Sequence, residues 1–320
     1  MNTVTAQLLH ESQLLYAQER DDEALALLRQ ALELEPASRE CHVQLAYVFF
    51  RTGRVYEAAQ ELVWLWAPQF GPQGGLLAPG VDLSGKTILL SADAGLGDSI
   101  MFARFALMLR HRGCRVVLQV QEPLVRLFQL SDLADVVVSR SEDVPPHDLR
   151  LPFHNLMAAV GVGHALPLMG SAGYLTPSAA DVAHFASQLP PPRSRRTVGI
   201  CWQGNPNFPN DKLRSVSLDA ILRFTDANDH VVSLVPTNTP IEGTSMAIQC
   251  FAFQDIAETA ALIQCLDYVI TVDTMVCHLS GALGVPTLLL NRFNGCWRWG
   301  KDQQRSIWYD AIEIKRLVRS

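Results

Sequence analysis

Two glycines between an apolar run and a helical pattern constrain the fold of this chain more than any other feature. Thr87–Leu90 is apolar or β-branched and ends at a polar turn, which predicts a buried strand. Apolar residues recur at helical spacing over residues 100–109. Gly95 and Gly97 lie between the two. Strand, glycine turn and helix form the first half of a βαβ unit, so this region is predicted to be α/β with a parallel sheet.

The same turn has the character of a ligand site. Without Cβ atoms, Gly95 and Gly97 let another molecule approach the backbone, and a helix N-terminus favours an anion or a nucleophile. Asp98 lies at the lip of this turn and has two interpretations. It is either the helix N-cap, which the turn alone favours, or a general base at the carboxyl edge of the sheet, where open α/β folds bind ligands.

Composition limits the classes of function. The chain has 320 residues, of which 48% are hydrophobic and 18% charged, as in an ordinary globular protein of two or three domains. A net charge of −6 gives no general attraction for nucleic acid or anionic membrane. No apolar run is long enough for a membrane span, the first residues lack a signal peptide, and seven cysteines include no C-x-x-C pair. We therefore expect a cytoplasmic protein without a membrane span or a nucleic-acid partner.

The first seventy residues contain an internal repeat. A shift of about 34 residues, the period of the tetratricopeptide repeat, superimposes two predicted helix–turn–helix units. The aligned positions are Glu23-Ala24 over Glu57-Ala58, Leu28 over Leu62, and Arg20 over Arg54. Two units are fewer than about three repeats needed for independent stability, so we expect the block to dock on the next domain through Trp64, Leu65 and Trp66. Its ten acidic residues and five arginines indicate either a solvated face or a groove for a basic protein segment.

Strands alternate with helices through the rest of the chain. Glycines and prolines concentrated around residues 70–80, and prolines again at residues 190–192, predict two linkers. We divide the chain into repeats at residues 1–70, a Rossmann-like domain at 71–190 and a second at 191–320, with a cleft between the last two. The expected strands are 87–90, 116–120, 135–138, 148–153, 197–202, 230–235, 248–253, 267–272 and 285–290, and the expected helices include 123–130 and 256–266.

Two nucleotide-binding motifs are excluded by their context. Gly80–Thr87 satisfies the phosphate-loop expression, but a linker precedes it and a strand follows, whereas that loop must open a helix. A dinucleotide fingerprint lacks its third glycine, because Ile100 stands there, and the second strand ends at Gln119–Gln121 without a ribose-binding carboxylate.

Two polar stretches of the second half carry candidate binding chemistry. The loop after residue 202 contains Lys212 and Arg214; lysine is a point charge for phosphate, and arginine can bind it through two hydrogen bonds. Asp273 ends a predicted strand, and His278 lies in the first turns of the helix that follows. That helix N-terminus can accept a diphosphate, and Asp273 can accept hydrogen bonds from ribose hydroxyls. The alternatives are a solvated loop, and an Asp N-cap followed by an inert histidine.

Together these motifs resemble a known family. The chain is similar to heptosyltransferase-like glycosyltransferases, of the GT-B class with two facing Rossmann domains, and in particular to the bacterial subgroup that carries tetratricopeptide repeats. The resemblance implies a short N-terminal helical repeat block followed by a GT-B fold. The residues that carry it are Ala94–Phe105, Gly204-Asn205-Pro206, Asn210–Ser215, Asp273-Thr274 with His278 and Gly281–Gly284, and Trp297-Arg298-Trp299 with Trp308-Tyr309.

The resemblance implies an inverting, metal-independent transfer of heptose or hexose from a nucleotide-diphospho-sugar to an acceptor hydroxyl, with proteins among the acceptors. Residues 71–190 would bind the acceptor and 191–320 the donor; no cofactor is implied, and no D-x-D metal motif is present. The implied partners are a nucleotide sugar and an acceptor protein or glycan held by the repeats. Asp98 would be the base, and the substrate-binding residues would be Gly95, Gly97, Asn205, Lys212, Arg214, Asp273, Thr274 and His278.

One departure keeps a second class open. Met275 stands where related chains have a small residue after the Asp-Thr pair, and its side chain would crowd a diphosphate. The alternative is a non-catalytic interaction or scaffold protein, in which the repeats bind a partner and the glycosyltransferase core is degenerate.

Overall fold

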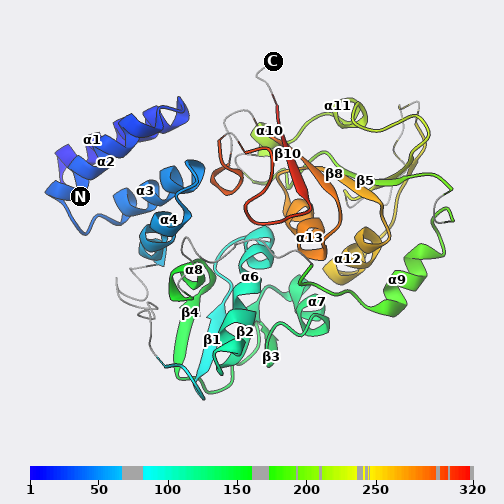
Figure 1. The fold of residues 1–320 in the computed structure, drawn as a ribbon, viewed down its shortest axis with the longest axis horizontal. Helices are drawn as coiled ribbons and strands as arrows, with labels where there is room; N and C mark the ends of the chain where they lie inside the picture. The colour runs from blue at the N-terminus through cyan, green and yellow to red at the C-terminus, as the bar shows by residue number, and fades with distance from the viewer. Residues whose placement is uncertain are drawn as a thin grey trace.

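A block of helices lies beside two parallel sheets, as Figure 1 shows. The computed structural model describes residues 1–66, 82–160, 173–191, 194–208, 211–235, 241, 244, 246–292, 296–301 and 303–317. The predicted linker near residues 70–80 and Asn210 lie outside this range, as does the side chain of Trp66. Within the described residues, no helix has the length and apolar character needed to cross a bilayer.

The N-terminal block consists of two antiparallel helix pairs, which confirms the predicted helix–turn–helix units. Glu19 in the first turn and Gly53 in the second both have a left-handed backbone, with φ of 63° and 78°. Small residues at the matching positions Ala24 and Ala58 are fully buried and let the helices approach closely. The elements are α1 Thr3–Ala17, α2 Asp21–Leu34, α3 Arg39–Arg51, α4 Val55–Leu62 and the 3-10 helix η1 Val63–Trp66.

The first sheet is parallel, with strand order β3-β2-β1-β4. Its central strand is the predicted Thr87–Leu90 run extended by one residue, and Leu89 lies opposite Val117 on one side and Arg150 on the other. Apolar runs buried on both faces are typical of parallel strands. The elements are β1 Thr87–Ser91, α6 Leu96–His111, β2 Arg115–Val120, η2 Glu122–Leu124, α7 Val125–Leu130, β3 Val136–Ser139, β4 Leu149–Pro152, η3 Phe153–Asn155 and α8 Leu156–Ala159.

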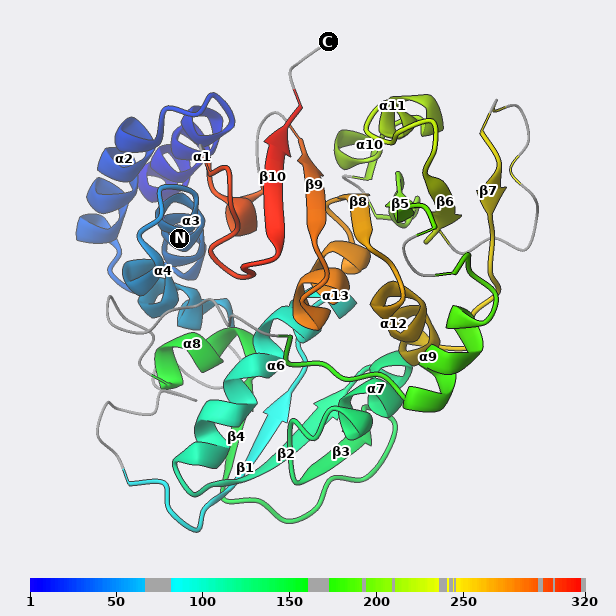
Figure 2. The same cartoon turned by 45° about the vertical axis from the view of Figure 1, so that its right-hand side comes forward.

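The second sheet is also parallel, with order β10-β9-β8-β5-β6-β7. Helix α9 comes before this sheet in the chain and packs on α12, where the Cys265 thiol lies 3.4 Å from the Val182 carbonyl oxygen (Figure 2). The elements are α9 Ala179–Ala186, β5 Thr197–Cys201, α10 Asp211–Arg214, α11 Leu218–Leu222, β6 His230–Ser233, β7 Ile248–Gln249, α12 Ile256–Gln264, β8 Tyr268–Val272, α13 Met275–Leu283, β9 Thr287–Asn291, η4 Trp297–Trp299 and β10 Ile312–Arg316.

Two strands differ from the prediction. The expected strand 248–253 pairs only over Ile248–Gln249, because Phe251 and Phe253 leave the ladder and pack on Phe185 of α9, at ring distances of 5.5 and 6.1 Å. Strand β10 was not predicted at all. The remaining expected strands are confirmed within one or two residues at each end.

The repeats dock on the rest of the chain through the predicted segment and through a second surface on α3. Trp64 stacks on His42 inside the block, with ring centroids 4.1 Å apart, so its face is already covered. The predicted segment does contact the next domain, because η1, which contains Trp64, Leu65 and Trp66, lies against η3. A second contact, which was not predicted, is made by Phe50 of α3, whose ring lies 4.5 Å from Trp297 and 6.1 Å from Trp308.

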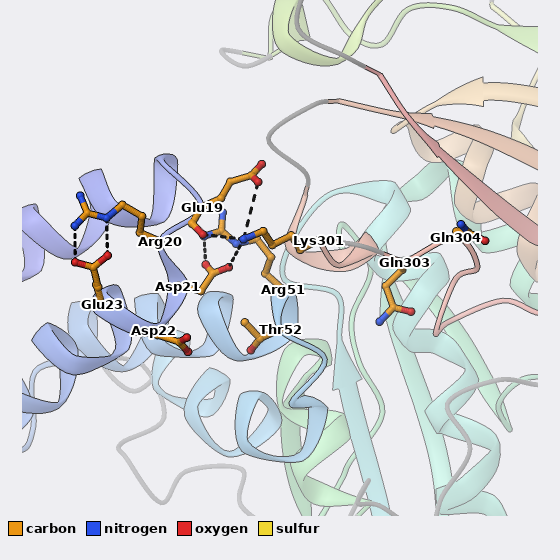
Figure 3. Close-up of a pocket in the computed structure, with 10 residues that line it drawn as sticks. All are labelled: Glu19, Arg20, Asp21, Asp22, Glu23, Arg51, Thr52, Lys301, Gln303 and Gln304. Atoms are coloured by element: carbon orange, nitrogen blue, oxygen red, sulfur yellow. Dashed lines mark hydrogen bonds and ion pairs between the residues drawn. The ribbon is translucent and has the colours of Figure 1, made fainter.

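Charged groups line the seam between the repeats and the C-terminal segment (Figure 3). Asp21 lies between Arg51, with which it forms a buried ion pair, and Lys301, whose Nζ is 3.6 Å from its Oδ2. Lys301 also donates its backbone N–H to the Arg51 carbonyl and its ammonium to the Glu19 carbonyl, at 3.1 and 2.8 Å. These charged groups line an open pocket of about 680 Å³. Their contacts connect the repeats to the segment that leads into the second sheet.

Candidate functional site

Two helix N-termini meet at the junction of the sheets. Helix α6 follows β1, and α13 follows β8, so both begin at the carboxyl edge of a parallel sheet, and the two helices pack together in both views. A Cβ on Gly97 would lie 2.7 Å from Cδ2 of His278, so only glycine fits at this contact. A Cβ on Gly95 would lie 3.6 Å from Asp98, an ordinary distance. Of the two predicted glycines, Gly97 is the one that the helix packing requires.

Asp98 is held by an ion pair rather than used as a cap. The N-cap of α6 is Gly95, so the interpretation of Asp98 as the N-cap is wrong. Its Oδ1 instead accepts hydrogen bonds from Nε of Arg298, at 2.8 Å, and from Nη2 of the same guanidinium. The two side chains are largely buried, with 13% and 20% of their surface exposed.

The neighbours of Asp98 decide its protonation. Burial opposes its ionisation, but the Arg298 guanidinium outweighs this, helped by His154 and His278, so the pKa of Asp98 is lowered. Burial likewise disfavours the charge of Arg298, and the facing carboxylate more than compensates, so the pKa of Arg298 is raised. Both groups are therefore charged at neutral pH, and Asp98 is a ready but weakened proton acceptor.

His278 lies at the centre of the junction as a neutral side chain. Its Nδ1 is hydrogen-bonded to the Tyr309 hydroxyl at 3.0 Å, and its ring lies 5.0 Å from the Trp299 ring. Burial, together with the charge of Arg298, lowers the pKa of His278 to about 4. A neutral imidazole can donate or accept one hydrogen bond without adding charge to the site.

Asp273 and Arg214 come together beside this histidine. Oδ1 of Asp273 accepts from Nε1 of Trp299 at 2.8 Å, and its backbone carbonyl accepts from Nη1 of Arg214 at 2.8 Å. Arg214 is oriented by an ion pair with Asp211, Nε to Oδ1, at 2.9 Å. Thr274 is the N-cap residue of α13 by position, but its hydroxyl lies toward Thr271, 3.4 Å away, instead of capping the helix.

Two predicted residues lie apart from this cluster. Asn205 is exposed, and its Oδ1 accepts from the Asn207 backbone N–H at 3.0 Å, which closes a local turn. Lys212 is exposed on α10. Within the residues that the structure describes, neither side chain is hydrogen-bonded or ion-paired to Asp98 or Asp273. The structure thus gathers Gly97, Asp98 and His278 at one contact and Arg214, Asp273 and Thr274 beside it.

Sequence reasoning missed two groups near Asp98. The first is Arg298, which was predicted only as a member of the Trp297-Arg298-Trp299 motif and given no role. The second group is a buried pair, in which Nδ1 of His154 lies 2.8 Å from Oδ1 of Asp93. Asp93 follows β1 and His154 follows β4, and β1 and β4 are neighbouring parallel strands. Polar residues that follow adjacent parallel strands meet at one sheet edge, and this signal could have found the pair.

No cluster suited to a metal ion is present among the described residues, taking three or more His, Cys, Asp or Glu side chains as the criterion. The cationic groups at the junction include Arg104, Arg214 and Arg298. Arg104 lies over the Tyr309 ring. The guanidiniums of Arg214 and Arg298 already have carboxylate partners, Asp211 and Asp98 respectively. An anionic ligand at the junction would therefore compete with these carboxylates for the two guanidiniums.

Comparison with known proteins places the fold among glycosyltransferases. A tetratricopeptide repeat family model matches residues 15–77, in agreement with the predicted repeats. A glycosyl transferase of family 9 from Veillonella parvula DSM 2008 is similar over 74% of this chain and 87% of its own, with a TM-score of 0.53 and 12% identity. The E. coli ADP-heptose LPS heptosyltransferase II is similar over 73% and 91%, with a TM-score of 0.52 and 13% identity. No curated protein matches the sequence.

At these identities the comparison establishes a shared fold. The chain combines tetratricopeptide repeats with the fold of heptosyltransferase-like glycosyltransferases, as the motifs predicted. Its mixed helices and parallel sheets fit that fold.

Proposed function

We propose that the protein is a glycosyltransferase that moves a sugar from a nucleotide-diphospho-sugar to an acceptor hydroxyl with inversion. One observation carries the proposal. An ionised, largely buried Asp98 faces the first turns of α13 across the junction of two parallel sheets, in a fold shared with glycosyltransferases. One similar structure is named as an ADP-heptose heptosyltransferase, so ADP-heptose is the first donor to test.

Helix α6 supplies the proposed base, and helix α13 receives the leaving diphosphate. Asp98 accepts the proton of the acceptor hydroxyl as the hydroxyl attacks the anomeric carbon. The diphosphate leaves toward the first turn of the nine-residue helix α13, which presents N–H groups and the positive end of a helix dipole. Arg214 offsets the developing charge, and its guanidinium is already fixed on the Asp273 carbonyl. One displacement from the side opposite the leaving group gives inversion.

Donor recognition uses the groups around the start of α13. Oδ1 of Asp273 is held by Trp299, which orients the carboxylate and leaves Oδ2 to accept from ribose hydroxyls. His278 stays neutral and supplies one hydrogen bond. Because two guanidiniums and a helix N-terminus surround the proposed diphosphate position, the leaving charge is balanced without a divalent ion, and we propose metal-independent transfer.

The repeats are proposed to select the acceptor. They carry a net charge of −5 up to Glu61, which suits a basic segment of an acceptor protein. Their contact with η4 brings them next to the junction: Tyr47 of α3 stacks against Trp297, with ring centroids 6.0 Å apart. An acceptor held on the repeats would therefore lie close to Asp98.

The test of this function is the conservative variant Asp98→Asn. It keeps the size of the side chain but cannot take a proton, so transfer from ADP-heptose, or from whichever nucleotide sugar the enzyme uses, should fall by about 10²- to 10⁴-fold. Donor affinity, measured by calorimetry, should change little. Asp219→Asn is the matched control, because Asp219 is an exposed carboxylate in the first turn of α11. Full activity of Asp98→Asn would refute the proposed base.

A second candidate is a non-catalytic scaffold with a degenerate glycosyltransferase core. The direct Asp98–Arg298 ion pair favours it, since the carboxylate is already neutralised by a partner from the same chain. In that case the wild-type protein should release no sugar from a panel of nucleotide sugars, either to water or to an acceptor. Turnover that disappears in Asp98→Asn would exclude the scaffold.

A further inference from the structure

The Asp98–Arg298 contact conflicts with the geometry that the proposed reaction needs. In an in-line displacement the sugar lies between the base and the diphosphate, so the groups that hold these two cannot touch. Here Nε of Arg298 lies 2.8 Å from Asp98, and Arg298 also lies within electrostatic reach of Asp273 and His278. The side chain of Arg298 therefore occupies the path between the proposed base and the proposed diphosphate position.

The backbone of Arg298 is fixed from both sides. Trp297 packs on Phe50 of the repeats, and Trp299 donates its indole N–H to Asp273. The Arg298 carbonyl accepts from Nε1 of Trp308 at 2.6 Å. With its neighbours anchored in this way, the guanidinium can change partner only by rotation about its own side-chain torsions.

Among the residues that the structure describes, the guanidinium has one strong partner, Asp98. Besides Asp98 it contacts Cys296, with Nη1 3.3 Å from Sγ, and it lies over the Trp297 ring at 4.3 Å. A thiol and an aromatic face are weak competitors for a guanidinium. A diphosphate carries more charge than one carboxylate and offers paired oxygens that match the arginine fork. A diphosphate can thus compete with the carboxylate for this guanidinium.

We propose that Arg298 is a donor-binding residue that exchanges its ion pair with Asp98 for one with the donor diphosphate, and so frees Asp98 when the donor binds. The inference rests on the proposed function and adds a residue and a sequence of events to it. The base is restrained by Arg298 until the diphosphate takes the guanidinium away.

The exchange changes the proton affinity of Asp98 in a known direction. The groups that face Asp98 are Arg298 on η4, His278 on α13, His154 on η3 and Tyr47 on α3. His278 is neutral at pH 7, and His154 is paired with Asp93. Arg298 is the strongest of the neighbours that lower the pKa of Asp98, so its departure raises that pKa and makes Asp98 a stronger base.

The experiment uses the full chain and inorganic pyrophosphate, which carries the diphosphate without a base or a sugar. Calorimetry of Arg298→Gln should show pyrophosphate binding about 10- to 100-fold weaker than wild type, the effect expected for a charge-assisted contact. Arg298→Lys keeps the charge without the fork and should lie between the two; it also serves if the glutamine variant does not fold. Arg305→Gln, an exposed arginine paired with Glu313, is the control and should bind as wild type.

A second readout follows Asp98 directly. Carboxylate NMR, with the Asp98 signal assigned by its loss in Asp98→Asn, should show a higher Asp98 pKa in Arg298→Gln than in the wild type. Saturating pyrophosphate should raise the Asp98 pKa more in the wild type than in Arg298→Gln. Equal pyrophosphate affinity in wild type and Arg298→Gln, or an Asp98 pKa that is the same in both proteins, would overturn this inference and leave the proposed function standing. A wild type that binds no pyrophosphate would overturn the proposed diphosphate site with it.

Discussion

The chemistry available to Asp98 is set by side chains from three separate parts of the chain. Arg298 comes from the C-terminal segment, His154 from the first sheet and His278 from the second. Burial alone would raise the pKa of Asp98, and the charged neighbours, Arg298 foremost, lower it below its ordinary value. His278 illustrates the opposite case, because no carboxylate outweighs its burial, and it stays uncharged. One cluster therefore holds an ionised carboxylate and a neutral imidazole.

The depressed pKa of His278 predicts a loss of stability in acid. Between pH 6.5 and about 4 the unfolded chain binds a proton that the folded chain does not, so the free energy of unfolding falls as the pH falls through this window. The loss should reach about 3 kcal/mol at pH 4, at about 1.36 kcal/mol per pKa unit. Urea denaturation of wild type and His278→Gln across the window measures it.

The variant removes the titration while an amide can still bond to Tyr309. The stability difference between wild type and His278→Gln should therefore shrink by about that amount from pH 7 to pH 4. His184→Gln, at an exposed position of α9, is the control and should leave the wild-type pH dependence in place. Parallel curves for wild type and His278→Gln would contradict the buried neutral histidine.

At the scale of elements, the contact between α6 and α13 defines the junction. Both helices follow central strands of their sheets, β1 and β8, and their first turns touch through Gly97 and His278. A glycine in a helix ordinarily weakens it, so its presence here indicates a requirement for close approach. The helix contact is thus obtained at the expense of local helix stability.

The sign of the stability change in Gly97→Ala shows whether helix propensity or the close helix contact dominates at this position. Helix propensity alone would make alanine stabilising by about 1 kcal/mol. The added Cβ would lie 2.7 Å from the buried His278 ring, and overpacking of this kind costs about 1–3 kcal/mol, so we expect net destabilisation in urea denaturation. Gly95→Ala, whose Cβ meets only ordinary contacts, should cost about 0.5–1 kcal/mol as a lost glycine cap. A Gly97→Ala protein more stable than wild type would refute the required close contact.

Most elements could be predicted from local pattern, because strands buried on both faces read as continuous apolar runs. Strand β10 could not: Glu313 and Lys315 are exposed and alternate with Ile312 and Ile314, and such a short alternation at a sheet edge is a weak signal. Residues 250–253 have a strand-like composition but are used to cover α9. In that case a tertiary contact overrides the local preference.

The candidate site also has residues that the sequence could predict and residues that it could not. Gly97, Asp98 and Asp273 could be found because each belongs to a strand–turn–helix unit that is local in the sequence. The pairing of Asp98 with Arg298 joins positions 200 residues apart, and nothing local determines which carboxylate an arginine meets. Asn205 was chosen by motif alone and Lys212 for its positive charge in a polar loop; both are exposed, and their place in a complex with donor is still a prediction.

At the scale of the whole molecule, Trp308 is the point where the three parts meet. Its ring lies 6.1 Å from Phe50 of the repeats and 6.2 Å from Phe102 of α6, the helix that follows the central strand of the first sheet. Trp308 itself belongs to the segment that ends in β10. The repeats therefore support the segment that carries Arg298. This contact adds to the predicted docking through Trp64, Leu65 and Trp66.

Phe50→Ala should loosen that support specifically. Loss of the buried ring should cost about 3–5 kcal/mol, and hydrogen exchange at the Lys301 amide, which donates to Arg51, should accelerate. Phe49→Ala is the matched control, because Phe49 is also buried but lies against Arg54 within the block. It should lower stability with less effect on exchange at Lys301. Equal exchange at Lys301 in both variants would show that Phe50 does not support the segment.

The contact between Phe50 and Trp297 also has a consequence during synthesis. About 250 residues separate the two rings, so at 5–20 residues per second the ribosome needs roughly 12–50 s to deliver the second after the first. For that time α3 presents an uncovered aromatic face to the cell. We therefore expect chaperones to bind the nascent repeats through this face, which includes Phe50, a residue that is buried in the finished protein.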